Sequence, residues 1–86
     1  MTERPQAASL TEDAEGRYAN YFKAGHNAFE VILEFGQFYE GDSLPRMHTR
    51  IVTTPAYAKT FLGVLQDLLG RHEKEFGPVG PGKTNE

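Results

Sequence analysis

The chain has 86 residues and no cysteine, so it has room for one small domain and can form neither disulfides nor thiolate metal sites. The lack of cysteine is also compatible with a reducing compartment. No segment approaches the ~20 consecutive apolar residues of a membrane span, and acidic residues stand where a signal peptide would have its apolar core. We therefore expect a cytoplasmic protein that does not enter a membrane.

The net charge of −3 comes from the N-terminal part of the chain, because basic and acidic residues are equal in number between residues 17 and 77. Residues 1–16 and 78–86 lack a spaced apolar pattern and are rich in Pro, Gly, Ala, Thr and charged residues. We expect a disordered acidic N-terminal tail, a single domain over residues 17–77, and a disordered Pro/Gly-rich C-terminal tail. The neutral domain would steer neither polyanions nor polycations over long range.

Residues 17–38 are dense in Tyr, Phe, Val and Ile, which favour β-strands, and residues 25–27 (GHN) interrupt this run. The pattern predicts a hairpin with its turn at residues 25–27. In the second arm, alternate residues would form one apolar face that reaches the protein core. These residues are Phe29, Val31, Leu33 and Phe35.

A turn-rich connection over residues 36–46 precedes a third extended run, MHTRIVTT, at residues 47–54. If the second and third strands pair in antiparallel fashion, Met47 and Ile51 join the apolar face. The opposite face would then carry Glu30, Glu34, His48 and Arg50. Cross-strand ion pairs between these residues would account for their charges.

The next residues predict a helix that begins at Pro55, because Thr54 is a good N-cap and Pro55 suits the first helical position. Gly77 and Pro78 would end it. Between them, apolar residues recur at three- and four-residue steps, which predicts one broad apolar stripe. The stripe comprises Ala58, Phe61, Leu62, Leu65, Leu68, Leu69, His72 and Phe76.

These elements predict a two-layer α+β domain in which a three-stranded antiparallel meander is crossed by one long C-terminal helix (βββα). The helix would be about 33 Å long at ~1.5 Å per residue, whereas an eight-residue strand spans only about 26 Å. Part of the stripe, including Leu68, Leu69 and Phe76, would overhang the sheet, so we expect a homodimer. Gly63 and Gly70 lie seven residues apart and either admit a close backbone or face solvent.

Five short sequences occur in order along residues 20–77. They are NYF at 20–22, FGQ at 35–37, RIV at 50–52, TPAYAK at 54–59 and EKEFG at 73–77. Together they resemble the small prokaryotic family catalogued as domain of unknown function number 3467. Two positions depart from that pattern, with Tyr57 in place of a histidine and His72 in place of a tyrosine. The resemblance implies a compact strand-strand-strand-helix protein of bacterial or archaeal type, with no established activity or catalytic residues.

The sequence offers no constellation for catalysis. His26, His48 and His72 lack the short spacings that place two ligands on one metal ion. Glu30 and Glu34 share a strand face but would lie about 13 Å apart at ~3.3 Å per residue, too far for an acid and base acting on one bond. We expect a protein that is not an enzyme and that uses no cofactor or metal.

The function that the sequence favours is a non-catalytic protein-binding or assembly module, such as an adaptor, a chaperone-like module or a component of a larger complex, acting as a homo-oligomer. Its expected interface is Phe38, Tyr39, Leu68, Leu69 and Phe76. Phe38 and Tyr39 either serve as aromatic anchors in the loop or fold back on the sheet edge. The alternative is single-stranded nucleic-acid binding by a sheet face that bears Arg46, His48 and Arg50.

Overall fold

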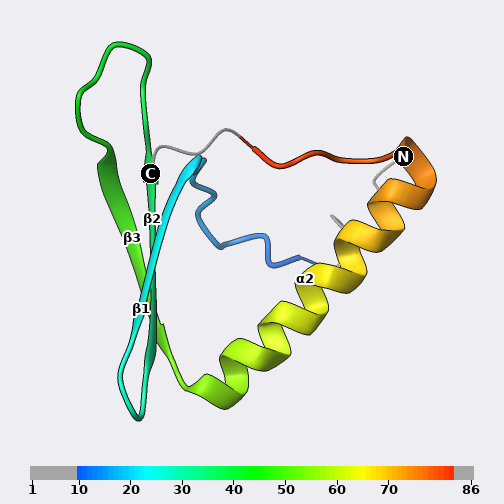
Figure 1. Ribbon diagram of the computed structural model, residues 1–86, viewed down its shortest axis with the longest axis horizontal. Helices are drawn as coiled ribbons and strands as arrows, with labels where there is room; N and C mark the ends of the chain where they lie inside the picture. The colour runs from blue at the N-terminus through cyan, green and yellow to red at the C-terminus, as the bar shows by residue number, and fades with distance from the viewer. Residues whose placement is uncertain (1–9, 83–86) are drawn as a thin grey trace.

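The computed structural model describes residues 10–82, and residues 1–9 and 83–86 lie outside the described part. Three strands come first, β1 (Tyr21–His26), β2 (Val31–Gln37) and β3 (Arg46–Thr53), followed by the helix α2 (Pro55–Phe76). The strands form one sheet in the order β1-β2-β3, and both neighbouring pairs are antiparallel (Figure 1). The α+β class and the predicted βββα order are therefore confirmed.

The first hairpin turns later than the sequence pattern predicted. β1 continues through Gly25, which pairs with Ile32, and the turn occupies residues 27–30. The side-chain oxygen of Asn27 accepts hydrogen bonds from the backbone N–H groups of Phe29 (2.9 Å) and Glu30 (2.8 Å), and this side-chain cap fixes the position of the turn. The assignment of Phe29 to the apolar face of the second strand was wrong, because Phe29 lies in the turn with 81% of its surface exposed.

Strands β2 and β3 pair in the predicted direction, with a β-bulge in β3. Phe35 pairs with Thr49, whereas the next residue, Gly36, pairs with Met47, so His48 is the extra residue. The expected faces of Met47 and His48 were therefore wrong, because the bulge reverses the alternation beyond it. A Cβ atom on Gly36 would lie 2.6 Å from the sulfur of Met47, which shows that Met47 shares the face of Gly36.

The sheet consequently has two distinct faces. The inner face is turned to the side on which α2 and the segment before β1 lie (Figure 1). It carries Phe22, Ala24, His26, Val31, Leu33, Phe35, Thr49, Ile51 and Thr53, whereas the outer face carries Tyr21, Lys23, Ile32, Glu34, Met47, Arg50 and Val52. On the inner face the rings of Phe22 and Phe35 meet edge to face, with centroids 5.7 Å apart.

The helix begins and ends where the sequence predicted. The hydroxyl of Thr54 accepts a hydrogen bond from the backbone N–H of Tyr57 (3.2 Å), and Pro55 stands at the start of the first turn. Gly77 caps the other end with a positive φ of 101°, a conformation that favours glycine. Its N–H donates to the carbonyl of Glu73 at 2.8 Å.

The helix does not lie across the sheet. It leaves β3 through the single residue Thr54 and runs away from the sheet along its whole length (Figure 1). The close contacts between elements are those of β1 with β2 and of β2 with β3. Among the residues that the structure describes, Gly36 alone is buried, and no apolar side chain is. The expected two-layer packing within one chain is therefore not formed.

The local reason lies at the junction of β3 and α2. A residue that precedes proline is kept out of the α region by a clash with the proline ring, and Thr54 accordingly has φ −91° and ψ 160°. With Thr54 as the single connecting residue, the connection between β3 and α2 has little freedom to turn the helix back over the sheet. Thr54 and Pro55 were predicted to start the helix, and the same two residues also bear on its direction.

All four elements lie within residues 17–77, the range predicted for the domain. The predicted tails cover residues 1–16 and 78–86. Their parts at 1–9 and 83–86 lie outside the described residues, and residues 10–16 and 78–82 contain no helix or strand.

Candidate assembly surfaces

The apolar residues of α2 form the helix stripe, which runs from Ala58 to Phe76. From Phe61 onward every residue of the stripe is exposed. The exposed fraction is 48% at Phe61, 47% at Leu69 and 67% at Phe76. His72 and Phe76 contact each other, with ring centroids 4.8 Å apart. We expected part of the stripe, including Leu68, Leu69 and Phe76, to extend beyond the sheet, and in the structure the exposed part is longer, because every stripe residue from Phe61 to Phe76 is exposed.

Gly63 and Gly70 lie on the opposite side of α2. At ~100° per residue, Gly63 is about 160° and Gly70 about 140° around the helix from Leu65, the centre of the helix stripe. A Cβ atom added at either glycine would meet nothing within 4 Å. No other part of the described chain approaches these glycines, which lie away from the helix stripe.

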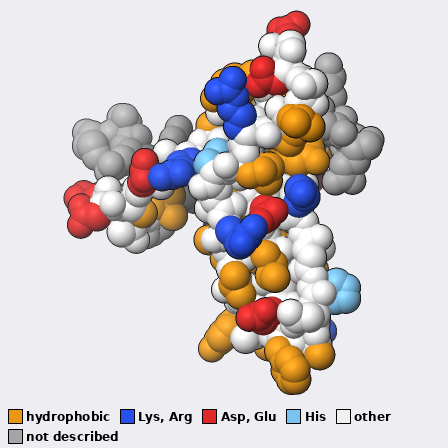
Figure 2. Space-filling view, turned by 90° about the vertical axis from the view of Figure 1, so that its left-hand side faces the viewer, with side chains coloured by type: hydrophobic (Ala, Val, Ile, Leu, Met, Phe, Trp, Pro, Cys, Tyr) orange, Lys and Arg blue, Asp and Glu red, His pale blue; other side chains and the backbone are white. Residues whose placement is uncertain are grey.

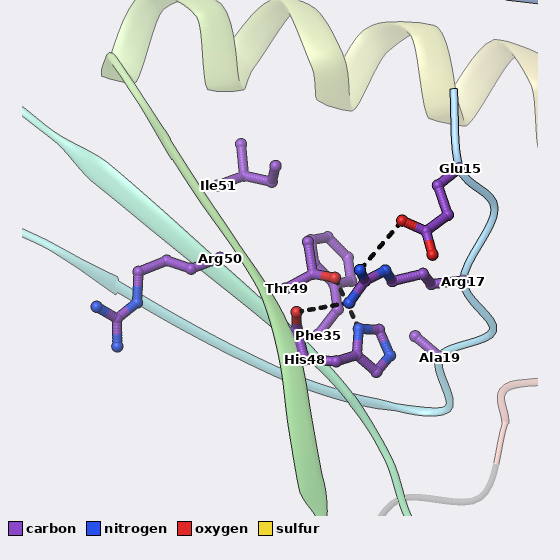
Figure 3. Close-up of a pocket in the computed structure, with 8 residues that line it drawn as sticks. All are labelled: Glu15, Arg17, Ala19, Phe35, His48, Thr49, Arg50 and Ile51. Atoms are coloured by element: carbon purple, nitrogen blue, oxygen red, sulfur yellow. Dashed lines mark hydrogen bonds and ion pairs between the residues drawn. The ribbon is translucent and has the colours of Figure 1, made fainter. Parts of the chain in front are cut away.

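The inner face of the sheet is the second uncovered apolar surface. Ile51 is 46% exposed there, and a hollow of about 590 Å³ opens over Phe35, Thr49 and Ile51. Figure 3 shows the segment before β1 on one side of this hollow and α2 beyond it. The described strand residues of the inner face include no Asp, Glu, Lys or Arg, whereas Glu15, Arg17 and Arg50 line the edges of the hollow.

A hydrogen-bonded strap holds the segment before β1 against the sheet (Figure 3). The guanidinium of Arg17 donates to the carbonyl of His48 (3.3 Å) and contacts the carboxylate of Glu15 (3.1 Å). The ring of His48 hydrogen-bonds the carbonyl of Tyr18 (3.0 Å) and the hydroxyl of Thr49 (2.6 Å). No role was predicted for Arg17 from the sequence, because its contact with the carbonyl of His48 depends on a bulge that local patterns do not reveal.

The outer face is mixed, as the sequence predicted. Glu34 and Arg50 face each other across β2 and β3, and the Arg50 Nε donates to the carboxylate at 2.6 Å. Figure 2 looks at this side of the sheet and shows acidic and basic side chains among apolar ones. The predicted ion pair of Glu34 with Arg50 is confirmed, and it accounts for these two charges without a ligand. The pairs predicted for Glu30 and His48 are not formed, because Glu30 accepts a hydrogen bond from Asn27 and the bulge places His48 on the inner face.

The loop aromatics fold back on the end of the sheet. Phe38 lies against Tyr21 with ring centroids 6.3 Å apart, and its backbone N–H donates to the side chain of Asn20 at 2.7 Å. The Arg46 guanidinium lies 5.1 Å from the centre of the Tyr39 ring, a cation–π contact. Phe38 and Tyr39 therefore belong to the sheet end, and the structure does not bring them together with Leu68, Leu69 and Phe76.

The three residues expected to contact nucleic acid do not share one surface. Arg46 lies over Tyr39 and pairs with Asp42 at 3.4 Å. Arg50 is paired with Glu34 on the outer face, whereas His48 belongs to the strap on the inner face. Figure 3 shows Arg50 pointing away from His48.

The acidic side chains and histidines of the described residues do not gather into one site. No group of three or more His, Asp or Glu side chains comes close enough to hold a metal ion among residues 10–82. Glu30 is engaged at the hairpin turn, where its carboxylate accepts from the Asn27 amide at 3.2 Å. No helix among residues 10–82 is both long enough and apolar enough to cross a membrane.

Comparison with known protein families gives one match. A family model described as "Protein of unknown function (DUF3467)" matches residues 2–80. The chain belongs to this family. The resemblance found in the five short sequences is thus confirmed, and the DUF3467 match includes all three strands and the helix. Neither the curated proteins nor the solved structures gave a match.

Proposed function

We propose that this DUF3467 protein is a non-catalytic assembly module that works as a homo-oligomer, a component or adaptor within a larger protein complex. The observation that carries the proposal is the absence of any buried apolar side chain among residues 10–82. A chain that folds must offset about 1–2 kcal/mol of backbone entropy per ordered residue, and burial of apolar surface is the main term that does so.

A second copy of the chain is the simplest source of the missing burial. A domain of about 60 residues has little stability to spare even with a complete core. This chain contains no disulfide, and its described residues hold no metal cluster, so neither of those aids is at hand. Association through the helix stripe and the inner face would remove apolar side chains of both copies from water.

The experiment that tests the proposal is a dilution series of the full chain, followed by light scattering for mass and by circular dichroism for melting. We expect a mass at least twice that of one chain, and a Tm that rises with protein concentration because folding and association are coupled. A folded species of single-chain mass, with a cooperative melting transition that does not depend on concentration, would contradict the proposal.

A further inference from the structure

This chain has two largely apolar surfaces, the helix stripe and the inner face of the sheet, and α2 lies on one side of the sheet without packing on it (Figure 1). Thr54 is the single residue between β3 and α2, and Pro55 confines it to the extended conformation observed. The chain therefore has an apolar helix and an apolar sheet face that do not pack on each other, and we call this sheet face the platform.

We propose that two copies exchange their C-terminal helices, so that α2 of each copy lies on the inner face of its partner's sheet. This inference rests on the proposed self-association and specifies its geometry. The occupant of the hollow over Phe35, Thr49 and Ile51 is then the helix stripe of the partner chain. In such an arrangement the interface is two-fold, and each copy gives and receives the same element.

The area available favours exchange over pairing of the two helices alone. The helix stripe runs from Ala58 to Phe76, about 28 Å at ~1.5 Å per residue, and at ~10 Å wide it has a footprint of about 280 Å². Helix pairing would cover two such footprints and leave both inner faces in water, whereas exchange covers all four surfaces. The footprint of the exchanged pair is about 1100 Å², just above the roughly 1000 Å² that a biological interface should clear, whereas helix pairing alone stays well below it.

Charge distribution selects the inner face as the platform. The strand residues of the inner face and the residues of the helix stripe include no Asp, Glu, Lys or Arg, and the charged residues at the hollow are Glu15 and Arg17 of the strap and Arg50 at its edge. The outer face presents Lys23, Glu34 and Arg50, and an apolar helix docked there would take the ion pair of Glu34 and Arg50 out of water at a cost. An uncharged stripe is thus complementary to the inner face and not to the outer one.

The strap positions the rim of this platform. Arg17 and Glu15 lie beside the hollow and keep their charges paired with each other at 3.1 Å, so the apolar floor stays open between the strap and the β3–α2 junction. The partner helix would enter from this open side, where α2 of the same chain points away from the sheet (Figures 1 and 3).

The lack of native cysteine allows a direct test by thiol cross-linking of the full-length chain. One variant carries Ile51→Cys on the inner face and an added affinity tag, and the other carries Leu65→Cys at the centre of the helix stripe. The two are unfolded in urea, mixed, refolded together and treated with a short bismaleimide. We expect a cross-linked tagged–untagged pair, in which a sheet of one chain is joined to a helix of the other.

The matched control moves the sheet cysteine by one residue to the outer face. Val52 is 54% exposed, close to the 46% of Ile51, so Val52→Cys presents a thiol of similar reactivity on the opposite side. We expect at least a tenfold lower yield of cross-linked pair with Leu65→Cys. Circular dichroism checks that each variant folds, and Ala24→Cys on β1 repeats the test if Ile51→Cys does not fold.

The outcomes separate the exchange from the self-association on which it rests. A dimer that links only Leu65→Cys to itself, or that links the Val52→Cys variant as well as the Ile51→Cys variant, overturns the exchange and leaves the proposed function standing. An Ile51→Cys/Leu65→Cys double variant that links within one chain also overturns the exchange. If that double variant has single-chain mass by light scattering, the proposed function fails too.

Discussion

The sharpest single-residue test of assembly is Leu69→Glu. Leu69 is 47% exposed in the single chain, so about half of its side-chain surface remains for a partner to cover. Full burial of a leucine contributes about 1.5–3 kcal/mol, so half of it contributes about 0.7–1.5 kcal/mol per copy and about 1.5–3 kcal/mol per two-fold dimer. Loss of that term alone raises the dimer Kd about 10- to 100-fold.

The glutamate adds the cost of placing a carboxylate in an apolar contact, so the shift should reach the upper end of that range or exceed it. Analytical ultracentrifugation over a dilution series measures the change in Kd. Thr60→Glu is the matched control, because Thr60 is exposed and lies about 140° around α2 from Leu65 at ~100° per residue. We expect the control to change Kd less than threefold. Equal Kd values for Leu69→Glu and the unmodified chain would refute the reasoning.

Three further substitutions test local parts of the structure. Gly36→Ala should destabilise the protein by about 1–3 kcal/mol in urea unfolding, because its Cβ would lie 2.7 Å from a backbone carbonyl oxygen of β3. Gly25→Ala is the matched control and should not destabilise the protein, because a Cβ there meets nothing within 4 Å. Gly63→Ala combined with Gly70→Ala should raise stability by about 1–2 kcal/mol through helix propensity with no change in the sedimenting mass; a weaker dimer would show that a partner backbone contacts the glycines. Asn27→Ala should lower Tm by about 4–8 °C through loss of about 1 kcal/mol of turn hydrogen bonding, and an unchanged Tm would contradict the assigned role of its side chain.

The order and type of the elements could be predicted from the sequence because each carries a strong local pattern. The β2 alternation and the step of three and four residues along α2 are signals that depend only on neighbours in the chain. The N-cap at Thr54 and the C-cap at Gly77 are likewise set by the chemistry of one residue each. These features did not require knowledge of what the elements pack against.

The bulge in β3 could not be predicted in the same way. Nothing in the residues around His48 marks an insertion, and its presence follows from the way Gly36 admits Met47 from the facing strand. One extra residue then reversed the assigned faces of Met47 and His48, which removed His48 from the expected nucleic-acid surface. A period-2 argument holds only up to the first irregularity in the ladder.

The candidate site was predicted in part. The helix stripe was identified from its spacing. The part of the stripe that packs on the sheet of the same chain was overestimated, because α2 was expected to lie across that sheet. The restriction that Pro55 places on Thr54 was present in the sequence and bears on the direction of the helix. Sequence patterns identify apolar surfaces well, whereas which surface meets which is decided by such junctions.

Many polar groups of this molecule find partners within the chain, whereas its apolar side chains stay in contact with solvent. Charges are paired within the chain, as in Glu34 with Arg50 and Asp67 with Arg71, and the turn and strap are closed by their own hydrogen bonds. The apolar side chains make local ring contacts, such as that of Phe22 with Phe35, but none of them is buried among residues 10–82. Exposed ion pairs contribute little and apolar burial is the dominant favourable term, so under the proposed assembly the free energy that fixes the position of α2 would come from contacts with a second chain.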